Sequence, residues 1–171
     1  MIYDIAIIGL GPAGSTLARL LNGEFKTIAI DKKTFGSDGF QKPCGGLLSS
    51  DAQKALAGFD MTLPKDVMVD PQIFAVKTID LKNNLIRHYQ RFYLNLDRQK
   101  FDLWLESIIP EDVELHCDSR CTRIERTQEG FKITFRQKNE LRTIFSRYLV
   151  GADGANSIVR RTFYPNKKIR N

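Results

Sequence analysis

Residues 3–31 read YDIAIIGLGPAGSTLARLLNGEFKTIAID, and this stretch decides the fold. Its first six residues form a nearly continuous apolar run, which is typical of a parallel strand buried on both faces. After the glycines, apolar residues recur at helical spacing, and residues 27–30 repeat the pattern of a buried strand. The helical set consists of Leu17, Ala18, Leu20 and Leu21. The order strand, tight turn, helix, strand predicts the opening of a doubly wound α/β sheet.

The tight turn, GLGPAG at residues 9–14, fits the spacing G-x-G-x-x-G in the setting that this motif requires. Its first glycine permits the turn, the second lets the backbone approach a diphosphate, and the third lets the helix pack closely on the strand. Asp31 ends the second strand, where a carboxylate can accept hydrogen bonds from ribose hydroxyls. The motif predicts an adenine-dinucleotide site and leaves FAD and NAD both open. We expect the following residues to bind the cofactor: Gly9, Gly11, Pro12, Ala13, Gly14, Asp31 and Lys32.

The composition indicates a globular protein of about one domain. The chain has 171 residues, of which 42% are hydrophobic and 27% charged, and this excludes disorder and a disulfide-rich miniprotein. No apolar stretch reaches about 18 residues and no basic region precedes the apolar start, so we expect neither a membrane span nor a signal peptide. Three cysteines in such a chain indicate a reducing, cytoplasmic compartment. Their spacing with the two histidines matches no zinc site, and we expect no metal.

The net charge of +6 is concentrated at the end of the chain. Residues 157–171 hold five cations and no acid, and the remaining residues are close to balanced. Such a tail could hold a phosphate or contact an anionic membrane peripherally, but a solvated end is the simpler interpretation. Aromatic residues do not interleave with these cations, so we expect no nucleic acid partner.

The rest of the chain alternates helices with antiparallel strands. Residues 50–53 resemble a capping box that opens a helix ending near Gly58. Asn83-Asn84 is expected to be the two-residue turn of a hairpin, and Asp97 is expected to cap the next helix. That helix has an apolar face formed by Phe101, Trp104, Leu105 and Ile108. Strands are predicted near residues 113–116, 121–126, 131–136 and 143–150, and a final helix begins at Asn156 or Ser157.

Two later segments, RQKFDLWL at residues 98–105 and VGADGANSIVR at residues 150–160, resemble signatures of the p-hydroxybenzoate-hydroxylase-like flavoprotein superfamily. The resemblance implies that the cofactor is FAD, with Arg98 near it and Asp153 in a segment that supports it. Arg98 would offer a fixed cationic fork to phosphate or ribitol oxygens. A solvated Arg98, and an Asp153 that only caps the following turn, remain the alternatives.

Within that superfamily, KPCGGL at residues 42–47 is similar to the cysteine-glycine loop of the geranylgeranyl reductase family. In that family the loop passes close to the flavin ring, which adds Lys42, Cys44, Gly45 and Gly46 to the expected cofactor-binding residues. Cys44 is the candidate catalytic residue, as a tuner of the ring or a proton donor, and an unreactive thiol is the alternative. The same resemblance places the backbone of Cys121 on the adenine side, although a plain strand residue is the simpler role.

The resemblance covers residues 3–161 and implies a doubly wound, Rossmann-like FAD-binding domain with a small antiparallel addition. We expect residues 1–68 and 97–171 to form that domain, and residues 69–96 to be the hairpin of a partial substrate domain. Family members continue with a Gly-Asp segment that is absent here, so the chain corresponds to an N-terminal portion. Apolar residues of the hairpin are therefore expected to be exposed or to pack on another copy, namely Ile79, Leu81, Leu85 and Ile86.

The implied function is that of an FAD-dependent oxidoreductase that reduces carbon–carbon double bonds of an isoprenoid or lipid-like small molecule, with NAD(P)H as electron donor. Two alternatives stay open within the resemblance: an FAD-dependent aromatic monooxygenase and a non-catalytic FAD-binding fragment. An NAD-dependent dehydrogenase would explain residues 9–31 but not the two later motifs.

Overall fold

The computed structural model describes residues 2–21, 23–34 and 44–167. Its internal contacts divide the chain into two compact units, which are described separately below. Unit 1 comprises residues 1–40 and 102–171, and unit 2 comprises residues 41–101. The three-part division expected from the resemblance stays a prediction, and Lys42 lies outside the described residues.

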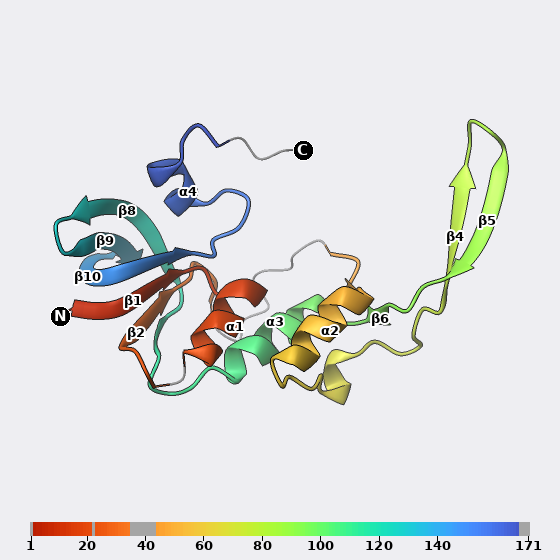
Figure 1. The fold of residues 1–171 in the computed structure, drawn as a ribbon, viewed down its shortest axis with the longest axis horizontal. Coiled ribbons are helices and arrows are strands. Elements are labelled where there is room, and N and C mark those ends of the chain that lie inside the picture. Colours follow the sequence, from red (N-terminus) through yellow and green to blue (C-terminus); the bar gives the residue numbers. More distant parts are fainter. Residues whose placement is uncertain (1, 22, 35–43, 168–171) are drawn as a thin grey trace. The chain divides into compact units, whose positions relative to one another are not determined.

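Unit 1 is built on one six-stranded sheet. Its strand order is β7-β2-β1-β10-β9-β8, in which the first four strands pair in parallel and the last two pair antiparallel. Helix α1 (Pro12–Leu20) connects β1 to β2, and Figure 1 shows it beside these two strands. The strands are β1 (Ile2–Ile8), β2 (Thr27–Ile30), β7 (Glu114–His116), β8 (Ser119–Thr127), β9 (Gly130–Gln137) and β10 (Glu140–Gly151). The predicted α/β fold with a parallel sheet and an antiparallel addition is confirmed.

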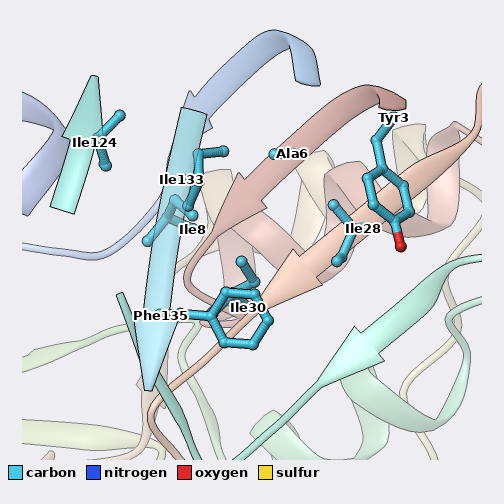
Figure 2. Packing of buried hydrophobic residues seen from close by; sticks show 8 residues of the cluster. All are labelled: Tyr3, Ala6, Ile8, Ile28, Ile30, Ile124, Ile133 and Phe135. Atoms are coloured by element: carbon cyan, nitrogen blue, oxygen red, sulfur yellow. The ribbon is translucent and has the colours of Figure 1, made fainter. Parts of the chain in front are cut away.

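Strand β10 joins the two parts of this sheet, because its first half pairs with β9 and its second half pairs with β1. The antiparallel strands also cover one face of the parallel strands: Ile124, Ile133 and Phe135 pack against residues of β1 and β2 (Figure 2). The opposite face of β1 and β2 packs against α1 in a second cluster that includes Ile7, Ala18 and Ala29. All four residues of β2 are buried, which explains why three of them are apolar and none is charged.

Two helical faces differ from the sequence pattern in detail. Leu20 of α1 is 47% exposed, because Leu17, Ala18 and Leu21 form the side that packs on the sheet. Helix α3 (Arg98–Ser107) ends before Ile108, and Ile109 is the buried residue that follows it. Pro110 explains this end, since the residue before a proline avoids the helical region.

Unit 2 contains α2 (Ser50–Gly58), the short helix η1 (Lys65–Val67) and two two-stranded sheets. Ser49, one residue before the predicted cap, caps α2 by accepting a hydrogen bond from the Ala52 amide. Asp97 caps α3 as expected, because its Oδ1 accepts from the amides of Gln99 and Lys100. One sheet pairs β3 (Leu47–Leu48) with β6 (Leu94–Asn95), and the other pairs β4 (Ala75–Asp80) with β5 (Leu85–Gln90).

The β4–β5 hairpin closes through four residues, 81–84, and the predicted two-residue turn was wrong. The side chain of Asp80 explains the difference, because its Oδ1 accepts from the amides of Lys82 and Asn83. Every residue of β5 is exposed, and Leu81 in the turn is 90% exposed. Helix α4 (Ile158–Phe163) follows β10 and begins one residue after Ser157, whose Oγ caps it by accepting from the Arg160 amide. Among the described residues, no helix is long and apolar enough to span a bilayer.

Candidate cofactor site

The glycine turn of unit 1 is closed by contacts that leave no room for side chains. Gly9 has a φ of +100°, and a Cβ there would lie 2.5 Å from the carbonyl oxygen of Ala152. A Cβ on Gly14 would lie 1.9 Å from the carbonyl oxygen of Gly9. The first and third glycines of the motif are therefore required by the tight turn and by the close approach of helix and strand, as the sequence predicted.

Helix α1 begins at this turn, and the backbone N–H groups of its first turn point out of its N-terminal end. Gly11 is the N-cap with extended backbone, Pro12 is the first helical residue, and no side chain of the described residues caps the helix there. Helix geometry leaves the N–H groups of Ala13 and Gly14 without partners inside the helix. Ala13 is exposed, and the helix dipole adds a positive potential at this end. This is an arrangement that binds anions such as a diphosphate.

Asp31 directs its carboxylate toward the glycine turn. Its Oδ2 accepts a hydrogen bond from the Leu10 amide, and its Oδ1 accepts from the Lys33 amide at 2.7 Å. The residue is 7% exposed. Because a carboxylate has about four lone-pair sites, these two hydrogen bonds leave about two of them unused.

Lys33 was not among the residues predicted from the sequence, which included its neighbour Lys32, but it occupies the interior of this end of the sheet. Its Nζ donates to the carbonyl oxygen of Leu10 at 3.1 Å and lies 3.3 Å from Oε1 of Glu106 and 3.6 Å from Oδ2 of Asp102. Lys32 is exposed. The sequence did hold one signal for a buried cation: Asp102 and Glu106 lie one helical turn apart, beside the buried Phe101 and Leu105. Two like charges at this spacing repel each other, so a nearby cation is expected.

Burial dominates the electrostatics around Lys33. It raises the pKa of Glu106, whereas the Lys33 ammonium opposes the shift and the carboxylates of Asp31 and Asp102 add to it. Burial also raises the pKa of Cys117 to about 12, with smaller contributions from Glu106 and Asp31. Cys117 therefore stays a neutral thiol at physiological pH.

The Asp-Gly segment after β10 lies against the glycine turn. The Ala152 amide donates to the carbonyl oxygen of Ile8 at 2.8 Å, and a Cβ on Gly9 would lie 2.8 Å from Cα of Asp153. The Oδ2 of Asp153 accepts from the Ile158 amide at 2.5 Å, so Asp153 does help to cap α4. Its Oδ1 is buried and has no hydrogen-bond partner among the described residues. One carboxylate oxygen of Asp153 is thus buried with its acceptor sites unfilled.

Cys121 lies in β8 and packs against the hydrophobic cluster that contains Ile133 and Phe135. Burial raises its pKa to about 12, and the nearby carboxylate of Asp153 contributes to the shift. Its side chain is that of a packed strand residue. The predicted contact of its backbone with the adenine side stays a prediction.

Unit 2 brings together three residues of the predicted cofactor set. The guanidinium Nη1 of Arg98 lies 3.8 Å from Sγ of Cys44, and the Gly46 amide donates to the same sulfur at 3.5 Å. Gly46 has a φ of +66°, and a Cβ there would lie 2.1 Å from the carbonyl oxygen of Leu96. The Leu96 amide donates to the Gly46 carbonyl oxygen at 2.8 Å. Gly46 is thus fixed to the residues that lead into α3, whereas a Cβ added at Gly45 would meet nothing within 4 Å.

The described residues fit the adenosine diphosphate portion of FAD. Glycines leave the backbone accessible where a diphosphate would approach, the first turn of α1 supplies amides, and Asp31 retains acceptor capacity. In unit 2, the Arg98 guanidinium is a suitable cation for phosphate or ribitol oxygens.

Comparison with known proteins agrees with this fit. Residues 109–165 match the model of a family described as an FAD binding domain. The chain is 53% identical over 169 residues to Protein CbrA of Escherichia coli strain K12, and the match covers 98% of this chain and 48% of the relative. Protein CbrA of Shigella sonnei matches over the same shares, also at 53% identity. The chain thus spans about half the length of the curated relatives it matches.

Solved structures of low sequence identity share the fold. A geranylgeranyl bacteriochlorophyll reductase-like protein from Thermoplasma acidophilum is 20% identical with a TM-score of 0.71, covering 86% of this chain and 38% of that protein. Aklavinone-11 hydroxylase, solved with FAD and aklavinone, is 16% identical with a TM-score of 0.72, covering 94% of this chain and 34% of that protein. The chain therefore has the α/β fold of FAD-binding flavoproteins, with an FAD binding domain match over residues 109–165.

Proposed function

We propose that this chain binds FAD and forms the FAD-binding part of an oxidoreductase. The observation that supports this best is the contact between two motifs far apart in the sequence: Gly9 of the glycine turn packs on Ala152 and Asp153 of the Asp-Gly segment. A dinucleotide turn alone would suit NAD equally well. The adjacent Asp-Gly segment and the FAD binding domain match favour FAD over an NAD-dependent dehydrogenase.

Each residue has a role under this proposal. The amides of Gly11, Ala13 and Gly14 receive the diphosphate, and the free acceptor sites of Asp31 receive the ribose hydroxyls. The exposed Lys32 offers a charge to the phosphates. Arg98 binds phosphate or ribitol oxygens, and Cys44 is the candidate catalytic residue. When bound, FAD supplies two-electron redox chemistry that side chains lack.

For the whole protein, we propose reduction of carbon–carbon double bonds in an isoprenoid or lipid-like small molecule, with NAD(P)H as electron donor. The cysteine-glycine loop and the fold shared with the reductase-like protein from Thermoplasma acidophilum support this reaction. An aromatic monooxygenase is the second candidate, supported by the fold shared with aklavinone-11 hydroxylase. The proposal also places the protein in the cytoplasm, with at most peripheral membrane contact and no nucleic acid partner.

The first test is retention of flavin by the purified chain. We expect the protein, incubated with FAD and desalted, to keep the visible absorption of oxidised flavin, and Asp31→Ala to lose most of it. Lys138→Met, an exposed substitution at the β9–β10 turn, serves as the matched control and should retain flavin as the wild type does. A colourless wild-type sample that binds NAD would contradict the proposal, and one that binds neither dinucleotide would indicate a non-catalytic relic.

The second test concerns Cys44 and the class of reaction. The assay uses the whole protein, under anaerobic conditions with NADPH. We expect it to reduce a double bond of a polyisoprenoid substrate, and we expect Cys44→Ala to slow that reduction at least tenfold. A requirement for oxygen, with a hydroxylated aromatic product, would identify a monooxygenase instead. Bound FAD that is never reduced would favour the non-catalytic fragment. Unchanged turnover in Cys44→Ala would remove this thiol from the mechanism.

A further inference from the structure

Leu10, between the first two glycines of the turn, has both of its backbone polar groups bound by side chains. Its amide donates to Asp31 Oδ2, and its carbonyl oxygen accepts from Lys33 Nζ and from Ser15 Oγ, each at 3.1 Å. The Leu10 side chain is fully buried. Hydrogen bonds in such a low-dielectric setting are strong, and they hold this peptide from two sides.

The ammonium of Lys33 is itself held in place from helix α3. A lysine ammonium has three N–H donors, and three acceptors surround it: the Leu10 carbonyl oxygen, Glu106 Oε1 and Asp102 Oδ2. The side chains of Lys33, Asp102 and Glu106 are 15%, 12% and 5% exposed. The flexible stem of lysine is thus fixed at its end, and the Lys33 ammonium joins the turn to α3.

We infer that Lys33 is a positioning residue. It fixes the glycine turn, before any cofactor binds, in the conformation in which the Ala13 and Gly14 amides have no partner inside the helix. The inference deepens the proposed function, on which it rests for the identity of the ligand. A turn that is ordered in advance spares the ligand the entropy cost of ordering it, so the affinity for the adenosine diphosphate portion rises. Lys33 needs no contact with FAD to act in this way.

A simple Lys33→Met variant would not test this role. It would leave the carboxylates of Asp31, Asp102 and Glu106 close together without their cation, and removal of one partner from a buried ion pair is strongly destabilising. Any loss of binding could then follow from poor folding. The double variant Lys33→Met/Glu106→Gln removes one carboxylate charge together with the ammonium and is compared with Glu106→Gln alone.

The decisive measurement is amide hydrogen exchange of residues 9–14 in the cofactor-free protein. We expect the double variant to exchange the Leu10 amide about five- to tenfold faster than Glu106→Gln, because the loss of one hydrogen bond loosens the turn. Amides of β9 and β10 should exchange at equal rates in both variants, and Lys138→Met should match the wild type throughout. Equal exchange of the Leu10 amide in the two variants would overturn the inference.

A titration with FAD separates this inference from the proposed function. We expect the double variant to bind FAD about tenfold more weakly than Glu106→Gln at equal thermal stability. If the wild type binds no FAD, the proposed function fails, and the exchange of Leu10 still decides whether Lys33 fixes the turn. If the turn exchanges faster and the FAD affinity is unchanged, advance ordering by Lys33 is refuted as a determinant of binding.

Discussion

At Gly14, one added methyl group would meet backbone rather than a movable side chain. The nearest atom is the carbonyl oxygen of Gly9, at 1.9 Å from the added Cβ, and the next is the carbonyl carbon of the same residue, at 3.0 Å. Backbone cannot rotate away, so helix α1 would have to separate from β1. Gly14, the third glycine of the candidate cofactor site, is therefore also a residue on which the stability of unit 1 depends.

We predict that Gly14→Ala lowers the free energy of unfolding by about 2–3 kcal/mol and abolishes flavin retention. Gly58→Ala is the matched control, since a Cβ on this last residue of α2 meets nothing within 4 Å. Alanine is favoured over glycine in helices, so the control should gain up to about 1 kcal/mol. Urea unfolding checks both values, and equal stability of the two variants would contradict the close contact.

At the scale of elements, a polar pair joins two strands that are not neighbours in the sheet. The hydroxyl of Tyr3 in β1 donates to Glu114 Oε2 of β7 at 2.5 Å, and β2 lies between these strands. Glu114 Oε1 lies 2.7 Å from Nε2 of His116. The hydrogen bond from Tyr3 is the largest of the effects that lower the pKa of Glu114, and burial raises the pKa of Tyr3 to about 12.

This pair predicts a pH dependence of stability. Because the pKa of Glu114 is lowered in the folded state, its contribution is present above the unfolded pKa near 4.5 and is lost as the pH falls below that value. Tyr3→Phe should lower the free energy of unfolding at pH 7 by about 1 kcal/mol, since Glu114 is half-exposed, and should flatten the fall between about pH 5 and pH 3. Tyr148→Phe, at a tyrosine 66% exposed in β10, should change neither. Chemical denaturation across this pH range measures the effect, and parallel curves for wild type and Tyr3→Phe would refute it.

At the scale of the whole molecule, the β4–β5 hairpin exposes several large apolar side chains. Ile79, Ile86 and Leu81 are 54%, 53% and 90% exposed, as expected from the sequence. A two-stranded hairpin is marginal in water, and its open edges and apolar side chains favour pairing. The curated relatives are about twice as long as the aligned region, which leaves ample chain to cover such a surface.

We predict that the isolated chain associates through this hairpin in a concentration-dependent way. The strands carry Lys77 and Arg87, so salt should strengthen the association by screening like charges. Ile79→Thr/Ile86→Thr keeps residues that favour strands and should shift sedimentation velocity toward monomer. Leu141→Thr, at a leucine 64% exposed in β10, should leave association unchanged. A monomer at all concentrations and salt levels would contradict the prediction.

The sequence predicted those features of the molecule that depend on neighbours along the chain. The structure confirms four elements that follow from local periodicity and turn chemistry: β1, the glycine turn, α1 and β2. In the predicted face of α1, Leu20 is the exception, because it is exposed. The strand predicted near residues 131–136 is likewise present as β9. The prediction of a two-residue hairpin turn was wrong, because the Asp80 side chain accepts hydrogen bonds from the amides of Lys82 and Asn83 and so stabilises a longer loop.

Contacts between distant segments were decided only by the tertiary structure. Nothing near Lys33 in the sequence shows that its ammonium meets Glu106 and the Leu10 carbonyl oxygen, and nothing near Gly9 shows that Ala152 excludes a side chain there. Local pattern determines which elements form, because helix and strand periods are properties of a short stretch of chain. The sheet order then determines which ends of those elements meet, and in this protein the carboxyl ends of β1, β2 and β10 create the candidate site.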